Sequence, residues 1–203
     1  MLNLRAAVQD SSHSNSLVLT QFLHDTLPKD LFVLTNLEIL RISFTYLEAI
    51  PKEMCRLADL SILELPHNKL RSIDQVVCFE NLKSLVLIGN KLTSIPKDFK
   101  KLQKLEYLDL SNNNFAAGLQ GSLPRNLVEI RLGNSNLRSF PEEILMLNAI
   151  RTVYLADNPE LQDIPLSIQN LKEIEELILT RTGVSNDHIE DLRRLLPNCK
   201  IFF

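Results

Sequence analysis

The chain has 203 residues, of which 45% are hydrophobic and 23% charged, and its formal net charge is −3. This length can bury one well-formed core, and the composition excludes collagen-like, disordered and disulfide-rich classes. Because the chain carries no basic excess and no apolar run near the roughly 20 residues of a membrane helix, we expect neither nucleic-acid binding nor membrane insertion.

Residues 1–36 are predicted to form an N-terminal cap with a degenerate repeat. Leu17, Leu19 and Phe22 alternate as in a strand, and the apolar tail that begins at Leu27 resembles those of later segments. A solenoid needs such a cap because its last repeat would otherwise expose the core. The first apolar stretch contains Arg5, which argues against a cleaved secretory signal, and no element is predicted over residues 1–13.

Residues 37–184 contain a repeat, and its period decides the fold. Seven segments begin at Leu37, Leu60, Leu82, Leu105, Leu127, Ile150 and Ile174, at steps of 22 to 24 residues. The third reads Leu82-x-x-Leu85-x-Leu87-x-x-Asn90-x-Leu92-x-x-Ile95-Pro96. The Leu-x-Leu alternation places two side chains on one face of a short strand, and stacking the same unit continues each Leu row into the next repeat.

These residues resemble the leucine-rich-repeat family, whose consensus is L-x-x-L-x-L-x-x-N-x-L-x-x-I-P. The resemblance covers about residues 37 to 200 and implies an α/β fold, a leucine-rich-repeat solenoid. Such a solenoid is a curved horseshoe with a parallel β-sheet on its concave face and irregular or short helical segments on its convex face. The pattern departs in three places. The fourth repeat lacks the I-P pair, which predicts an irregular convex loop, and the second has Asp74 in place of the proline. The sixth has one residue more than its neighbours in Asn158-Pro159-Glu160-Leu161.

Residues 185–203 are predicted to form the C-terminal cap. Asp187 and Glu190 resemble a capping box, and Ile189, Leu192 and Leu196 recur at helical spacing. Pro197 ends the helix, after which the last residues are expected to return as an edge strand beside Ile178.

The strand residues between the Leu rows are expected to face the concave side. Ile39, Phe44, Ile62, Val86 and Ile88 place apolar side chains where solvent is expected, which favours a partner-binding patch over scattered exposed residues. Charged and aromatic residues typical of protein interfaces accompany them. The partner-binding residues expected on this face are Ile39, Arg41, Phe44, Ile62, Glu64, His67, Val86, Ile88, Tyr107, Asp109, Asn112, Arg131, Arg151 and Tyr154.

A row of asparagines is assigned a structural role, because a buried amide must satisfy backbone groups where each strand turns. The row comprises Asn68, Asn90, Asn113 and Asn158. For His67 both a contact role and an ordinary solvated side chain remain open. Cys55 and Cys78 share one repeat position and could form a disulfide, but two reduced thiols are preferred for a chain expected in the cytoplasm.

No catalytic motif, phosphate loop or metal-ligand spacing is present in the sequence, so we expect no enzyme, no metal and no cofactor. The leading hypothesis is a monomeric module that binds a protein partner, such as an adaptor or an effector. It would act in the cytoplasm or after export without a cleaved signal. The alternatives are a regulatory arm of a larger enzyme or receptor and, less favoured, recognition of a glycan or small ligand.

Overall fold

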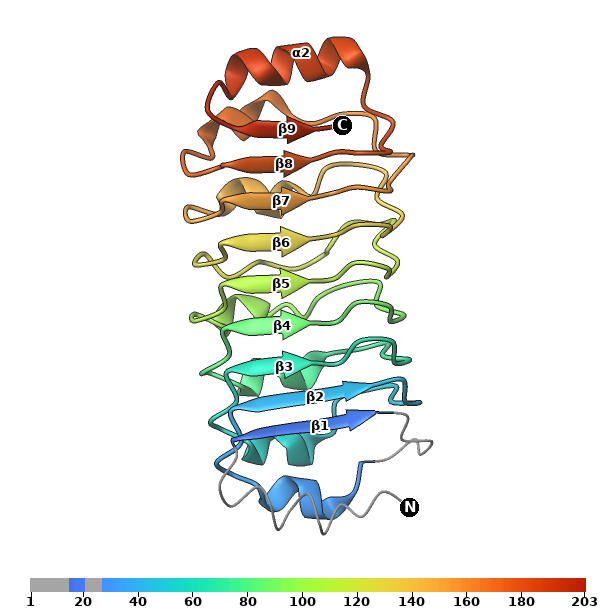
Figure 1. Ribbon diagram of the computed structural model, residues 1–203, viewed down its shortest axis with the longest axis vertical. Helices are drawn as coiled ribbons and strands as arrows, with labels where there is room; N and C mark the ends of the chain where they lie inside the picture. The colour runs from blue at the N-terminus through green and yellow to red at the C-terminus, as the bar shows by residue number, and fades with distance from the viewer. Residues whose placement is uncertain (1–14, 21–26) are drawn as a thin grey trace.

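The computed structural model describes residues 15–20 and 27–203, which form one sheet of nine parallel strands in sequence order (Figure 1). Each strand pairs with the next in the chain, so the seven repeats and both flanking strands share one continuous ladder. The strands are β1 (Ser16–Thr20), β2 (Ile39–Ser43), β3 (Ile62–Glu64), β4 (Ser84–Val86), β5 (Tyr107–Asp109), β6 (Glu129–Arg131), β7 (Thr152–Tyr154), β8 (Glu176–Ile178) and β9 (Lys200–Phe202).

The strand register follows the repeat. Leu40 pairs with Leu63, Leu63 with Leu85 and Leu85 with Leu108, and all four side chains are fully buried. Fully burying a leucine contributes about 1.5–3 kcal/mol, so each row adds stability only when the next repeat covers it. The predicted solenoid with a parallel sheet is therefore confirmed.

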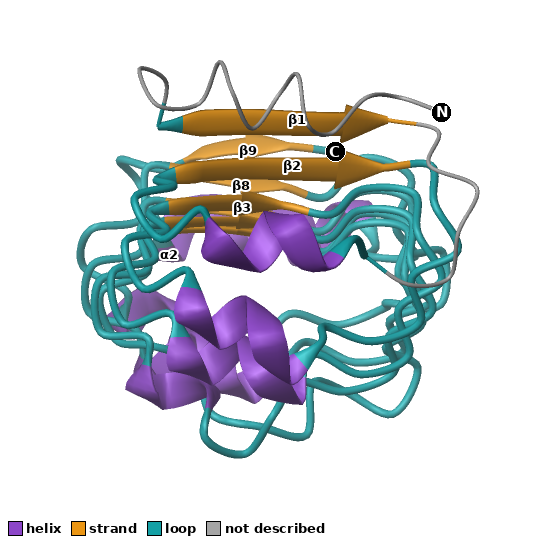
Figure 2. Ribbon diagram, turned by 90° about the horizontal axis from the view of Figure 1, so that it is seen from below, coloured by secondary structure: helices purple, strands orange, loops and turns teal. Residues whose placement is uncertain are grey.

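Short 3-10 helices form the back of the solenoid, on the side opposite the sheet (Figure 2). They are η1 (Lys29–Val33), η2 (Lys52–Arg56), η3 (Asp74–Cys78), η4 (Phe99–Lys101), η5 (Glu142–Met146) and η6 (Leu166–Asn170). Pro51, Pro141 and Pro165 immediately precede three of them in extended conformations, because proline fixes φ and suits the start of a helical turn. The fourth repeat has no helix between β5 and β6, as its sequence predicts.

The N-terminal strand extends the sheet by one repeat. Leu17 and Leu19 of β1 are buried and pair with Leu40 and Ile42 of β2. The prediction that Phe22 belongs to the same strand falls outside the described residues, as does the N-terminal segment 1–13.

The C-terminal cap is an α-helix followed by a strand. Helix α2 (Asn186–Leu195) begins after Ser185, whose hydroxyl accepts a hydrogen bond from the His188 backbone N–H at 3.2 Å. The prediction that Asp187 caps the helix is therefore wrong: the N-cap is Ser185, two residues earlier, whose hydroxyl pairs with the free His188 N–H of the first turn. Strand β9 pairs with β8, and Phe202 lies beside Ile178, as predicted.

Cys55 and Cys78 form a disulfide on the back of the solenoid, with their Cα atoms 5.6 Å apart. The preference for two reduced thiols is therefore wrong in this structure. Cys55 lies in η2 and Cys78 in η3. Stacking of neighbouring repeats therefore brings these equivalent positions within disulfide reach.

Of the helices in the described part of the chain, none combines the length and apolar character required to cross a membrane.

Candidate functional site

The concave face carries two outward columns of side chains, one on each side of the buried Leu row. Consecutive members of each column pair in register across the strands. The first column is Ile39, Ile62, Ser84, Tyr107, Glu129, Thr152 and Glu176, and the second is Arg41, Glu64, Val86, Asp109, Arg131, Tyr154 and Ile178. Each repeat adds one side chain to each column, so residues that are far apart in the sequence form one surface.

The predicted apolar patch is less exposed than expected. Ile39, Ile62, Val86 and Ile88 are half-buried by their neighbours on the sheet. The Arg41 guanidinium donates to the Glu64 carboxylate at 2.8 Å, and this ion pair lies beside the Ile39–Ile62 pair. The patch therefore alternates apolar and charged pairs, as at the polar interfaces of proteins.

The turn that follows each strand has the same backbone conformation in all seven repeats. One residue of each turn has a positive φ between 48° and 71°. This row, which we call the turn row, comprises Phe44, His67, Gly89, Asn112, Asn134, Asp157 and Arg181. Glycine and asparagine tolerate the left-handed region, whereas a bulky side chain there is strained by about 1–2 kcal/mol. Phe44, His67 and Arg181 therefore occupy positions that folding alone would give to smaller residues.

The N-terminal end of the turn row forms an aromatic stack. The rings of Phe44 and His67 lie nearly parallel, with their centroids 4.9 Å apart. The His67 ring in turn lies against Gly89, where an added Cβ would stand 2.5 Å from His67 Nδ1. Phe44 remains 58% exposed, so one aromatic face is held rigidly toward solvent.

The central repeats place an arginine between two tyrosines. The Arg131 guanidinium carbon is 5.9 Å from the centre of the Tyr107 ring and 5.5 Å from that of Tyr154. Arg131 Nε also donates to Glu129 Oε1 at 2.6 Å. Burial is the largest single influence and lowers the pKa of Arg131, but the bond to Glu129 and the charges of Tyr107, Glu129 and Asp109 together outweigh it, so the pKa of the guanidinium rises. Burial, followed by the nearby Asp109 carboxylate, raises the pKa of Tyr107.

A polar hollow of about 470 Å³ adjoins this cluster. Its lining residues are Ile88, Asp109, Ser111, Asn112, Arg131, Gly133, Asn134, Tyr154 and Asp157. Gly133 is required here, because an added Cβ would lie 2.6 Å from the Tyr154 ring. The repeat places Ser111, Gly133, Asn134 and Asp157 after the strands of the concave face, but the predicted partner-binding set did not include them; the regular spacing of the turn row, read for asparagine and glycine, is the signal that could have singled them out.

Two predicted contact residues need correction. Asp109 is only 8% exposed, and its carboxylate accepts the Ser111 backbone N–H at 2.9 Å, so it supports the turn from the floor of the hollow. Arg151 lies in the loop before β7 and outside both outward columns. It is exposed and pairs at 3.3 Å with Glu175, the equivalent residue of the next repeat. Arg151 falls outside the columns because β7 begins only at Thr152, and the repeat pattern does not determine where a strand begins.

The asparagine row bridges repeats through its buried amides. Asn90 donates to the carbonyls of Leu65 and Leu87 and accepts the Leu70 backbone N–H. Asn158 accepts the N–H groups of both Ser135 and Leu137. Asn68 and Asn113 make equivalent bonds in their own repeats. These contacts agree with a structural role, whose energetic weight remains a prediction.

The charges of the concave face are largely paired with one another. Arg41, Arg131 and Arg181 all pair with carboxylates of this same surface. Among residues 15–20 and 27–203, no group of three or more histidine, cysteine or acidic side chains could hold a metal ion. What the face offers a ligand is aromatic rings, neutralised charges and fixed hydrogen-bonding groups.

Comparisons with known proteins point to the same architecture. A family model described as leucine rich repeat matches residues 59–115, and a second with the same description matches residues 104–127. No curated protein sequence matches the chain.

Solved structures with leucine-rich repeats share the fold. The leucine-rich-repeat domain of the type III effector XopL is 22% identical, with a TM-score of 0.72 over 98% of this chain and 80% of that one. Internalin C2 of Listeria monocytogenes is 21% identical, with a TM-score of 0.74 over 97% of this chain and 82% of that one. At this level of identity the likeness concerns the fold alone.

A plant protein gives a partial match. The ectodomain of the receptor kinase GASSHO1/SCHENGEN3 of Arabidopsis thaliana is 26% identical, with a TM-score of 0.61. The match covers 78% of this chain and 20% of the receptor ectodomain.

Proposed function

The chain is a leucine-rich-repeat protein, and from that premise we propose that it is a non-enzymatic module that binds a protein partner through its concave face. One observation carries the proposal: Arg131 is clamped between Tyr107 and Tyr154 beside an open polar hollow. Tyrosine and arginine are enriched at binding hot spots, because they provide large contacts at a low entropic cost. Here the stacking and the bond to Glu129 already fix the guanidinium, so little side-chain freedom remains to be lost on binding.

The Phe44–His67 stack is proposed as the second anchor on the same face. A strained and exposed aromatic residue costs folding stability, which favours a function for it. The two anchors lie on different repeats of one rigid sheet, so a single partner lying along the strands' C-terminal ends would contact both.

The proposal is tested by affinity capture followed by direct measurement. The purified chain is used as bait in cell extracts, retained proteins are identified by mass spectrometry, and the affinity of each is measured by calorimetry. We expect Arg131→Ala combined with Tyr107→Ala to weaken partner binding by about tenfold or more, since hot-spot truncations cost roughly 2 kcal/mol. Arg138→Ala is the matched control, because its exposed ion pair with Glu160 lies outside the outward columns.

Two results would overturn the proposal. One is a folded double variant, checked by circular dichroism, that binds every partner as tightly as the parent protein. The other is a repeated capture that yields no partner dependent on the concave face.

The compartment is also a proposal. The Cys55–Cys78 disulfide favours an oxidising environment, and thus action after export, over the cytoplasm expected from the sequence. Mass spectrometry of the protein from its native cells, alkylated on lysis, tests this: Cys55 and Cys78 found fully alkylated would argue for a reducing compartment.

An arm of a larger enzyme or receptor remains a second candidate, which the match to part of a receptor kinase ectodomain favours. The native size of the protein, measured by immunoblot with an antibody against this chain, would separate the two. A band near 23.2 kDa supports a free-standing module, and a much larger band supports the arm.

A further inference from the structure

The back of the solenoid is interrupted at the fourth repeat. Helix-to-helix packing joins η1 to η2, η2 to η3, η3 to η4 and η5 to η6. Between η4 and η5 the chain instead passes through an irregular segment, in which Gly118 and Gln120 have positive φ values. Leu119 and Leu123 still fill the core beneath this segment, so the sheet and core continue while the outer layer lacks one helix.

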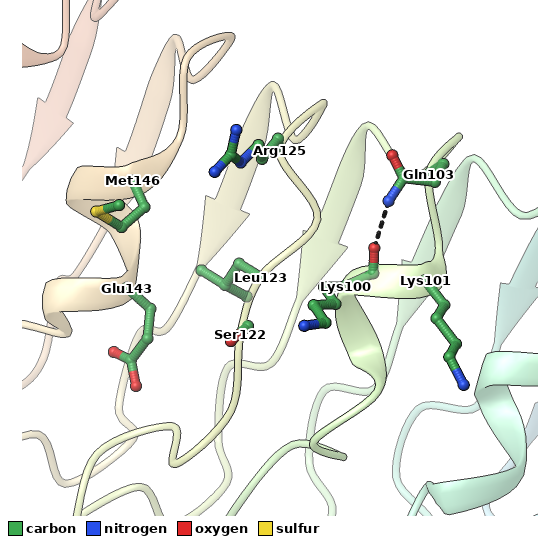
Figure 3. Close-up of a pocket in the computed structure, with 8 residues that line it drawn as sticks. All are labelled: Lys100, Lys101, Gln103, Ser122, Leu123, Arg125, Glu143 and Met146. Atoms are coloured by element: carbon green, nitrogen blue, oxygen red, sulfur yellow. Dashed lines mark hydrogen bonds between the residues drawn. The ribbon is translucent and has the colours of Figure 1, made fainter.

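The missing helix leaves a pocket of about 450 Å³, which we call the back pocket (Figure 3). It is lined by Lys100, Lys101, Gln103, Ser122, Leu123, Arg125, Glu143 and Met146. Gln103 Nε2 donates to the Lys100 carbonyl at 2.6 Å, and the Asn126 side chain donates to the Gln103 carbonyl at 2.6 Å. These bonds fix the irregular segment to the end of η4, so the walls of the pocket are held in place.

Three cations line the back pocket of a protein whose net charge is negative. Lys101 is neutralised by Asp98 of its own turn at 2.8 Å. Lys100 and Arg125, in contrast, form no close ion pair among the described residues, although Lys100 still attracts the Asp98 carboxylate, whereas the arginines of the concave face are paired. Figure 3 shows the Lys100 ammonium and the Arg125 guanidinium on opposite sides of the segment that carries Leu123. Asp98 offsets Lys101, and Glu143 on the far wall offsets one of the other two cations, so the pocket has one net positive charge.

An apolar surface accompanies this charge. Leu123 forms part of the floor and is almost fully buried, while Met146 of η5 is 65% exposed. Methionine is flexible and polarizable, so it adapts to apolar ligands of different shapes. The pocket thus joins cationic groups on the η4 side to an apolar wall on the η5 side.

We propose that the back pocket binds a peptide segment of a partner protein in which an acidic side chain stands next to an apolar one. The carboxylate would accept charge-assisted hydrogen bonds from the Lys100 ammonium, with Arg125 attracting it from the other side of the Leu123 segment, and the apolar side chain would lie against Leu123 and Met146. One net positive charge matches a single carboxylate, whereas Glu143 would repel a doubly charged phosphate group. This site is on the face opposite the proposed concave interface and does not depend on it.

The three methionines offer a direct measurement. The protein is labelled with ¹³C at the methionine methyl groups, where Met146 is exposed and Met54 is fully buried as an internal reference. The probe is the capped tripeptide acetyl-Leu-Glu-Leu-amide, and the matched peptide contains Gln in place of Glu. We expect a saturable shift of the Met146 signal with the Glu peptide, an unchanged Met54 signal, and an affinity for the Gln peptide weaker by about tenfold, or 1.4 kcal/mol.

Variants of the protein complete the test. Lys100→Gln removes the cation that would bind the carboxylate and should weaken binding of the Glu peptide by about fivefold to tenfold. Arg125→Gln removes only the attraction from the other side of the segment and should weaken binding by about twofold. Lys52→Gln, on η2, is the matched control and should leave binding unchanged. The proposal is overturned if Met146 does not respond, if the Gln peptide binds equally well, or if both pocket variants retain full affinity. It is also overturned if inorganic phosphate shifts Met146 at lower concentration than the peptide, because the site would then select doubly charged anions.

Discussion

The N-terminal and central repeats of the concave face share one backbone but present different side chains. In the central repeats the turn row contains Asn112 and Asn134, which suit its left-handed conformation, and the Asn134 amide donates to the Asn112 side chain at 2.7 Å. In the N-terminal repeats the same positions hold Phe44 and His67, which are strained there and stack on each other.

This difference distinguishes turn-row residues that suit the left-handed backbone from those that are strained in it. Asparagine in the turn row serves the fold, so its presence in the central repeats reveals little about binding. Phe44 and His67 oppose the local backbone preference, which supports the proposal that they serve binding. The comparison can be tested by asking which substitutions each half tolerates.

The largest expected effect concerns the direction of the strand side chains, on which the comparison depends. Leu85 is fully buried and Val86, its neighbour, stands in an outward column. Leu85→Glu should unfold the chain, because it places an unpaired charge in the core. Val86→Glu should change the free energy of unfolding by about 0.5 kcal/mol or little more. Urea denaturation followed by circular dichroism measures both, and comparable losses would show that Val86 belongs to the core.

The second effect belongs to the N-terminal repeats alone. Replacing both Cys55 and Cys78 by alanine should lower the free energy of unfolding by about 3 kcal/mol, because the disulfide closes a loop of 23 residues. The measurement is the melting temperature of the double variant against the parent protein, each with and without dithiothreitol. Reductant should lower the melting temperature of the parent and leave that of the variant unaltered; equal melting temperatures without reductant would contradict the expectation.

The asparagine row should show losses of similar size in the two regions, because its buried amides bond backbone N–H and carbonyl groups in both. Asn90→Ala near the N-terminal repeats and Asn158→Ala in the later ones should each cost about 1–3 kcal/mol, since each leaves buried backbone groups unpaired. The urea midpoints of both variants measure this. Asn114→Ala, on an exposed side chain outside the left-handed region, is the control. A wild-type midpoint for either buried variant would refute the structural role.

The smallest effect is the most direct test of the comparison. Asn134→Phe should lower the free energy of unfolding by about 1–2 kcal/mol, because a bulky residue enters the left-handed region and the bond to Asn112 is lost. Phe44→Asn should leave stability unchanged or raise it by about 0.5 kcal/mol, since relief of the left-handed strain offsets the stacking it removes. If Phe44→Asn instead destabilised the chain as strongly as Asn134→Phe, the aromatic stack would be part of the fold.

The sequence by itself determined the fold, the number of strands in residues 37–184 and the irregular convex segment of the fourth repeat. It could do so because a solenoid contacts only its neighbours, so that a local pattern repeated in phase specifies the whole architecture. The same period placed Ile39, Arg41 and their equivalents on the outward columns, since side chains alternate along a strand.

Only the tertiary structure decided which side chains of neighbouring repeats contact each other. The contacts of Arg131 with two tyrosines and the stacking of Phe44 on His67 join residues more than 20 positions apart in the sequence. The Cys55–Cys78 disulfide and the back pocket also arise from how neighbouring turns lie against each other. The physical reason is that a repeat pattern fixes which face a side chain occupies, whereas its exposure and partners depend on the size and charge of the residues one repeat away.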